Sequence, residues 1–166
     1  LYEALVARFG GPATAEELSQ RHFRLVCQLL EEDRVGPMPG LEEALDALRR
    51  RGIPFGVVSS SWRWYVEHCL RELGMYEDAA VIVTGSDGLP LKPAPAPYQA
   101  AARVFRPAPP GAVLAVEDSG SGVRSAVAAG LACAAVYNPD SGAQDLSPAR
   151  WRLNSLYELP ALLDGN

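Results

Sequence analysis

The sequence lacks the features that mark several classes of protein. No apolar run approaches the length of about 20 residues that a membrane-spanning helix needs, although 48% of the 166 residues are hydrophobic. Cys27, Cys69 and Cys133 are too few and too widely spaced for a disulfide framework or a metal cluster, so we expect reduced core thiols. No signal peptide, repeat or low-complexity tract is visible in these residues. These absences favour a cytoplasmic globular protein without a membrane partner.

Positive charge is also scarce. The sequence holds 15 Lys and Arg against 20 Asp and Glu, which gives a formal net charge of −5, and Lys92 is its single lysine. Nucleic-acid surfaces depend on clustered positive charge, so we expect no nucleic-acid partner. The one basic run, Arg49, Arg50 and Arg51, ends a predicted helix, where cations complement the helix dipole.

The first part of the chain has helical periodicity and a linker after it. A helical pattern over residues 1–33 is broken at Gly10, Gly11 and Pro12, and a capping box from Thr14 to Glu17 begins a second helix. A Gly- and Pro-rich linker follows over residues 35–40. We therefore predict a helical unit over residues 1–36 and a larger unit over residues 37–166. Because the first residue is not Met and no capping signal precedes the first helix, we expect a further N-terminal segment.

After the linker, predicted helices alternate with short apolar strands. The predicted strands cover residues 53–58, 80–84, 112–116, 132–136 and, weakly, 151–153. The predicted helices cover residues 41–51 and 156–163 and, with approximate ends, 62–73, 96–105 and 122–129. This alternation is typical of an α/β fold with three layers, in which helices cover both faces of a Rossmann-like parallel sheet. Ligands of such folds bind at the carboxyl ends of the strands.

Two adjacent carboxylates end one of these strands. Glu117 and Asp118 directly follow the apolar run over residues 112–116. A buried strand gains from ending in two acids when a cation meets them, and Mg²⁺ commonly takes one or two carboxylates together with phosphate oxygens and water. We therefore predict that Glu117 and Asp118 hold Mg²⁺. The alternative is that Asp118 or Ser119 caps the next helix and Glu117 faces solvent.

Serine hydroxyls and one ammonium group are placed at the same predicted edge. Ser59, Ser60 and Ser61 lie between a strand and a helix, where hydroxyl and N–H groups can bind an anion or merely cap the helix. Ser61 and Arg63 are weaker candidates for substrate contacts, because an arginine in a first helical turn is usually a surface residue. Lys92 lies in a loop stiffened by three prolines, which could hold its charge against a developing anion. The alternative is a solvated loop lysine.

Taken together, three segments resemble one known family. Residues 57–61 (Val-Val-Ser-Ser-Ser), 92–95 (Lys-Pro-Ala-Pro) and 116–122 (Val-Glu-Asp-Ser-Gly-Ser-Gly) are similar, in order and spacing, to the second, third and fourth motifs of the haloacid dehalogenase-like (HAD) hydrolase superfamily. The resemblance is closest to the β-phosphoglucomutase and phosphoglycolate phosphatase branch. It implies a HAD-like core after a remnant of the helical cap that closes over the substrate in this branch.

The resemblance also implies roles for the residues. Ser59 would bind the transferring phosphoryl group, Ser60 its oxygens through the backbone, and Lys92 would neutralise charge during the transfer. Glu117 and Asp118 would help to hold Mg²⁺. The implied activity is a Mg²⁺-dependent phosphohydrolase that acts on a small phosphorylated metabolite through an aspartyl phosphate, and the implied alternative is a sugar phosphomutase.

The family's first motif, Asp-x-Asp, occurs nowhere in the sequence. In this family it supplies the nucleophile and the general acid/base, on a central strand between the strand that ends at Val58 and the strand that ends at Val116. We therefore expect the first central strand to be missing and its nucleophile to lie upstream of Leu1, unless another segment fills the gap, because each unpaired buried backbone group costs about 1 to 3 kcal/mol. A catalytically inactive HAD-like binding module is the second alternative.

Overall fold

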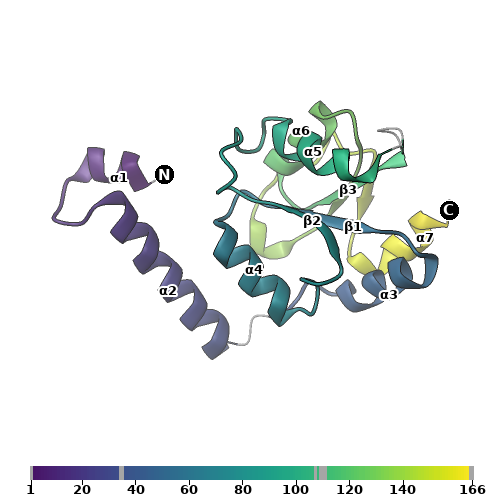
Figure 1. The fold of residues 1–166 in the computed structure, drawn as a ribbon, viewed down its shortest axis with the longest axis horizontal. Helices are drawn as coiled ribbons and strands as arrows, with labels where there is room; N and C mark the ends of the chain where they lie inside the picture. Colours follow the sequence, from purple (N-terminus) through teal and green to yellow (C-terminus); the bar gives the residue numbers. More distant parts are fainter. Residues whose placement is uncertain (1, 34–35, 107, 109–111, 165–166) are drawn as a thin grey trace. The chain divides into compact units, whose positions relative to one another are not determined.

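A computed structural model describes residues 2–33, 36–106, 108 and 112–164 (Figure 1). The chain forms two compact units, Leu1–Pro37 and Met38–Asn166, and this boundary lies one residue from the one predicted. None of the helices in the described residues has the length and apolar character needed to cross a membrane.

The first unit is a pair of helices, α1 (Tyr2–Phe9) and α2 (Ala15–Asp33). The predicted capping box is confirmed: Thr14 N donates to Glu17 Oε2 at 2.8 Å, and Glu17 N donates back to Thr14 Oγ1 at 3.2 Å. The hydroxyl of Tyr2 is hydrogen-bonded to His22 Nδ1, which ties α1 to α2. These local contacts explain why the two helices form a unit of their own.

The second unit has the predicted alternation of helices and strands. Its regular elements are α3 (Leu41–Arg51), β1 (Phe55–Val58), α4 (Arg63–Glu72), β2 (Ala79–Val83), α5 (Ala96–Ala102), β3 (Leu114–Glu117), α6 (Gly120–Ala128), β4 (Ala132–Val136), β5 (Trp151–Leu153) and α7 (Leu159–Leu163). Short 3₁₀ turns cover Arg103–Phe105, Pro139–Ser141 and Leu156–Glu158. Strand β1 begins two residues later than predicted, because Pro54 has no N–H to give to a ladder and Ile53 N bonds to Leu48 O at the end of α3.

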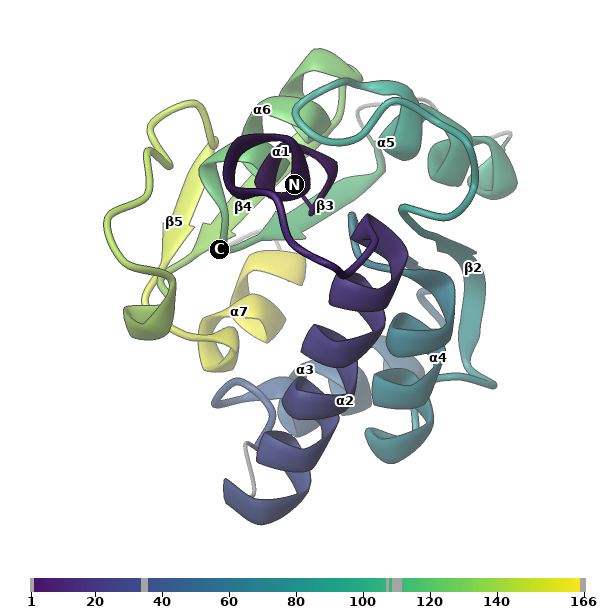
Figure 2. The same ribbon diagram turned by 90° about the vertical axis from the view of Figure 1, so that its left-hand side faces the viewer.

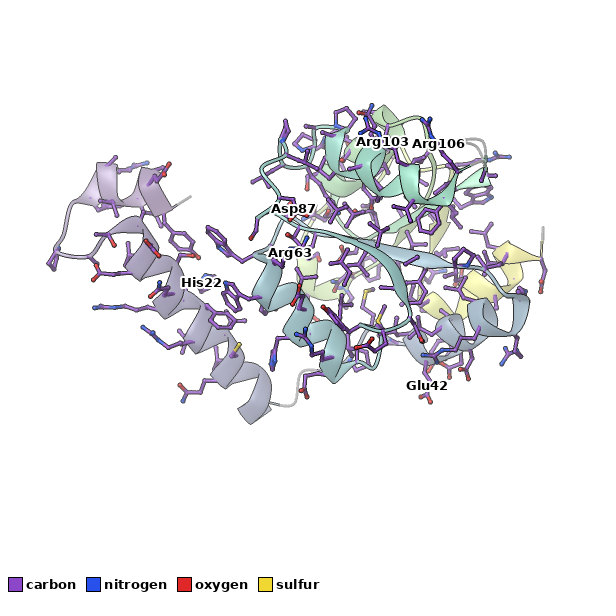
Figure 3. All side chains as sticks on the ribbon, in the orientation of Figure 1. His22, Glu42, Arg63, Asp87, Arg103 and Arg106 are labelled. Carbon is purple, nitrogen blue, oxygen red and sulfur yellow. The ribbon has the colours of Figure 1, made fainter. Side chains whose placement is uncertain are left out.

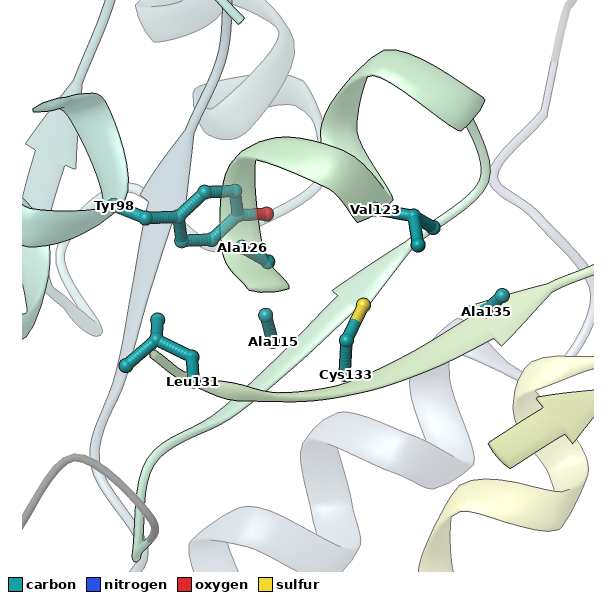
Figure 4. Packing of buried hydrophobic residues seen from close by; sticks show 7 residues of the cluster. All are labelled: Tyr98, Ala115, Val123, Ala126, Leu131, Cys133 and Ala135. Carbon is teal, nitrogen blue, oxygen red and sulfur yellow. The ribbon is translucent and has the colours of Figure 1, made fainter. Parts of the chain in front are cut away.

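Helices cover both faces of the strands, which confirms the three layers (Figures 1 and 2). Helices α5 and α6 lie over one face and α3, α4 and α7 over the other. The core under α5 and α6 is shown in Figure 4 and consists of Tyr98, Ala115, Val123, Ala126, Leu131, Cys133 and Ala135. The core on the opposite face consists of Ala44, Ala134, Val136, Leu153, Leu156 and Leu159.

The strands form two separate parallel sheets. One contains β1 and β2, and the other has the order β3-β4-β5. Within the described part of the chain no strand lies between β1 and β3, so the expectation that another segment fills the gap is wrong for these residues. All four residues of β1 are only half-buried, and Val116 in β3 is 37% exposed. Strands with helices on both faces are normally buried, so this exposure marks open edges where a central strand was expected.

Candidate functional site

Lys92 connects the two sheets. From the loop between β2 and α5, its Nζ donates to the carbonyl oxygen of Val58 at 2.9 Å and to Oε1 of Glu117. The side chains of Lys92 and Glu117 are 9% and 6% exposed. Lys92 is therefore a buried ion-pair partner, and the alternative of a solvated loop lysine is wrong.

The Val58 carbonyl points into the open edge of β1. Ser59 N donates to Val83 O in β2 at 2.9 Å. The C=O and N–H of one trans peptide point in opposite directions, so Val58 O faces away from β2. The ammonium group thus satisfies one of the backbone acceptors that the open edge leaves without a strand partner.

Glu117, the last residue of β3, is held by protein donors on both carboxylate oxygens. Lys92 and the hydroxyl of Tyr98 donate to Oε1, and Ser119 Oγ donates to Oε2 at 3.3 Å. The alternative in which Glu117 faces solvent is therefore wrong. The capping part of that alternative is confirmed for Ser119, whose Oγ accepts from Gly122 N at 3.0 Å as the N-cap of α6.

Tyr98 was not singled out from the sequence. It lies on α5, and its ring is 5.0 Å from Lys92 Nζ while its hydroxyl bonds to Glu117, so it contacts both members of the ion pair. Burial, followed by the nearby Glu117 carboxylate, raises the pKa of the Tyr98 phenol far above its ordinary value, which keeps it a hydrogen-bond donor. The available signal was weak: a buried tyrosine needs a partner for its hydroxyl, but the sequence does not show which tyrosine is buried.

Asp118 differs from Glu117 in its surroundings. It is half-buried, and its Oδ2 accepts from Asn138 Nδ2 at 2.8 Å and from Ser141 Oγ at 3.2 Å. Among the described residues no donor is recorded at Oδ1, which leaves one carboxylate oxygen for a cation. An oxygen ligand of this kind suits Mg²⁺. The described residues contain no cluster of three or more His, Cys, Asp or Glu with metal-binding geometry, so Asp118 would fill only part of a coordination shell. Because both carboxylate oxygens of Glu117 accept from protein donors, its role as a metal ligand stays a prediction.

Ser59, Ser60 and Ser61, here called the serine turn, follow β1. Ser59 Oγ accepts from Ser61 N at 3.1 Å. The N-cap of α4 is Trp62, and the first helical N–H, that of Arg63, donates instead to Ser86 Oγ at 3.0 Å. The alternative that the serines cap the helix is therefore wrong. Because Val58 directly precedes the turn and accepts from Lys92, the serine turn, Lys92 and the acid pair lie together at the carboxyl ends of β1 and β3.

Arg63 is engaged by other protein groups. Its NH2 lies 2.8 Å and 2.9 Å from the two carboxylate oxygens of Asp87, and its NH1 lies 3.4 Å from Glu67. These contacts give Arg63 a structural role, while its contact with a substrate stays a prediction.

Known proteins resemble this chain in sequence and in structure. A family model described as haloacid dehalogenase-like hydrolase matches residues 2–130. The chain belongs to this HAD-like hydrolase family. The family resemblance seen in the sequence is thereby confirmed.

Individual relatives support the same assignment. The chain is 33% identical, over 98% of its length and 74% of the relative, to the inferred phosphatase YhcW of Bacillus subtilis. It is 31% identical to phosphoglycolate phosphatase of Xylella fastidiosa, over 76% of this chain and 55% of the relative. The structure of CbbY from Rhodobacter sphaeroides in complex with phosphate matches with a TM-score of 0.78 and 27% identity, over 90% of this chain and 67% of CbbY.

The HAD-like hydrolase thus combines a recognised fold with a polar site at the expected edge. The structure brings together the serine turn, Lys92, Glu117 and Asp118, which the sequence predicts as site residues, and their roles stay predictions. Sequence reasoning missed Tyr98, Asn138 and Ser141, because their contacts depend on how α5 and the loop after β4 pack against β3.

Proposed function

We propose that this HAD-like hydrolase is a Mg²⁺-dependent phosphatase of a small phosphorylated metabolite. The observation that carries the proposal is the position of Lys92: its ammonium group contacts both the Val58 carbonyl beside the serine turn and Glu117 beside Asp118. One cation between hydroxyl groups and carboxylates is the arrangement that phosphoryl transfer needs. The phosphatase names of two relatives and the phosphate complex of CbbY support the same activity.

In this proposal each group of the site has a separate task. Ser59 and the backbone of Ser60 hold the phosphoryl oxygens, and Lys92 neutralises charge on them. Asp118 would hold Mg²⁺, and Glu117 is the second predicted ligand. When bound, Mg²⁺ would supply further positive charge to the phosphoryl group. Lys92 and Tyr98 keep Glu117 in place at the end of β3.

The nucleophile belongs to a strand that fills the space between β1 and β3. We infer that sequence upstream of Leu1 supplies this strand with the family's Asp-x-Asp motif. Its first aspartate would bond to phosphorus as the bond from phosphorus to the substrate oxygen breaks, and its second aspartate would donate a proton to the departing alcohol. Water then hydrolyses the aspartyl phosphate to inorganic phosphate and frees the aspartate. The open edges of β1 and β3 support this inference, because a central strand would pair with both.

The test is an assay of the full-length protein, including its natural upstream sequence, with p-nitrophenyl phosphate and a panel of small phosphate esters, with and without Mg²⁺. We expect turnover that depends on Mg²⁺ and is lost in Asp118→Asn. Asp46→Asn is the matched control and should keep full turnover, because the Asp46 side chain is 50% exposed on α3. Absence of metal-dependent turnover would contradict the proposal, whereas transfer of the phosphoryl group to a second position of a sugar phosphate would identify a phosphomutase.

The absence of Asp-x-Asp from the sequence favours one other function, an inactive module that binds a phosphorylated ligand or a partner protein. Such a module would melt at a higher temperature in the presence of its phosphate ester but would not hydrolyse it. Hydrolysis by the full-length protein excludes this alternative.

A further inference from the structure

The loop after β2 packs directly onto the serine turn. Gly85 N donates to Ser61 O at 2.8 Å. A Cβ at Gly85 would lie 2.3 Å from Ser60 O and 2.9 Å from Ser60 C, so only a glycine allows this approach. The position of the serine turn is therefore coupled to the conformation of this loop, which continues to Lys92.

A pair of charged residues holds the loop in place. NH2 of Arg63, at the start of α4, lies 2.8 Å and 2.9 Å from the two oxygens of Asp87 (Figure 3). The backbone N of Arg63 donates to Ser86 Oγ at 3.0 Å. Asp87 and Ser86 are adjacent in the loop, and they bind the side chain and the backbone of Arg63, which lies two positions after the serine turn.

Asp87 is fixed from the other side as well. Its Oδ2 accepts from the backbone N of Thr84 at 2.9 Å, and Thr84, which directly follows β2, is 3% exposed. Burial opposes ionisation of Asp87, but the hydrogen bonds from Arg63 and Thr84 outweigh it and hold its pKa below the ordinary value. An ionised Asp87 therefore connects the end of β2 to the start of α4.

We propose that Arg63 and Asp87 are positioning residues that fix the serine turn relative to the Lys92 loop and do not themselves touch phosphate. This inference rests on the proposed function, because it assigns the turn to phosphate binding. It also gives Arg63 a different role from the direct substrate contact considered from the sequence.

Because the pair is partly exposed, its loss should affect the position of the serine turn more than the global stability of the protein. The side chains of Arg63 and Asp87 are 41% and 25% exposed, and exposed ion pairs add little to global stability. A small shift of a binding group, in contrast, can reduce catalysis strongly. The chain also offers a matched control, the Arg49–Asp78 pair, with a separation of 2.6 Å and exposures of 47% and 43%.

The test uses the full-length protein with Asp87→Asn, Arg63→Gln and the double variant, and Arg49→Gln as the control. We expect kcat/KM for p-nitrophenyl phosphate to fall about tenfold in either single variant, with no further fall in the double variant. Inhibition by inorganic phosphate should weaken by a similar factor. Arg49→Gln should keep both values, and its melting temperature should change as much as that of the single variants.

Two results would overturn the proposal. A loss of kcat/KM in Arg63→Gln with full activity in Asp87→Asn would mean that Arg63 contacts the substrate directly. Unchanged amide hydrogen exchange at Ser60, Ser61 and Gly85 in Asp87→Asn, relative to Arg49→Gln, would mean that the pair does not fix the turn. The exchange measurement needs no activity, so it decides on positioning even if the parent protein does not hydrolyse phosphate esters and the proposed function fails.

Discussion

Gly122 lies against the carboxylate of Glu117 so closely that a Cβ at position 122 would be 1.9 Å from Oε2 and 2.1 Å from Cδ. The first turn of α6 therefore passes directly over the end of β3. Because Glu117 also receives hydrogen bonds from Lys92 and Tyr98, it has little room to move away.

Replacement of Gly122 by alanine should therefore displace Glu117 and weaken its contact with Lys92. We expect the free energy of unfolding to fall by about 1 to 3 kcal/mol, as for other overpacked sites. Urea denaturation followed by circular dichroism measures the change. Gly36→Ala is the control, since a Cβ at Gly36 meets nothing within 4 Å. Equal stability of the two variants would contradict the close approach.

Replacement of Lys92 by methionine should leave the Glu117 carboxylate buried without its cation. Breaking a buried pair by removing one partner costs about 3 to 5 kcal/mol. Arg51→Met, which breaks the more exposed pair with Asp164, should cost less than about 1 kcal/mol. The same denaturation experiment compares them.

The double variant Lys92→Met, Glu117→Gln tests the cause of the expected loss. Because the glutamine is neutral, it should recover part of the stability that Lys92→Met removes. If Glu117→Gln lowered the free energy of unfolding as much in the Lys92→Met variant as in the parent protein, the buried charge would not be the cause.

Replacement of Tyr98 by phenylalanine keeps the ring beside Lys92 and removes only the hydroxyl that bonds to Glu117. A hydrogen bond to a charged group is worth about 1.5 to 3 kcal/mol, and we expect a stability loss of this size. Tyr157→Phe is the control, because Tyr157 is 57% exposed. Thermal unfolding of both variants checks the prediction, and equal melting temperatures would count against the assigned hydrogen bond.

We expect the Cys133 thiol to make the folded protein less stable at alkaline pH. Cys133 is fully buried on β4, and burial, followed by the Glu117 carboxylate, raises the pKa of its thiol to about 11. Between about pH 9 and 11 the folded protein keeps a thiol proton that the unfolded chain has lost. The contribution of this thiol to the free energy of unfolding is therefore fully present below about pH 9 and is lost as the pH rises toward 11. A shift of about two pH units corresponds to about 2 to 3 kcal/mol.

The measurement compares the pH dependence of unfolding in the parent protein and in Cys133→Ala, with the half-buried Cys69→Ala as control. Between pH 9 and 11 the parent and Cys69→Ala should lose more stability than Cys133→Ala, in which the raised pKa of Tyr98 still lowers stability above about pH 10. Parallel curves for all three would show that the Cys133 thiol does not titrate differently in the folded state.

Most of the second unit could be predicted from the sequence because its signals are local. The apolar run of β4 and the helix over Leu41–Arg51 appear with the predicted bounds, since each is delimited by glycine or polar residues nearby. Cys27 and Cys69, in contrast, are half-buried and do not lie in the core as expected. Both lie on helices, where periodicity alone does not determine which side is covered.

The site was predictable by residue type more than by contact. Chain order places Ser59, Lys92 and Glu117 at one edge of a parallel sheet, which is a consequence of topology. That Lys92 bonds to the backbone of β1, or that Arg63 pairs with Asp87, depends on loop conformations that no periodic pattern encodes.

The unpaired strand edges have a consequence for the association of the chain with itself. Exposed backbone donors and acceptors on β1 and β3 can pair with the same edges of another molecule. Oligomers formed in this way would grow with protein concentration and would be suppressed by a peptide that pairs with these edges as an added strand. Light scattering over a dilution series would reveal them.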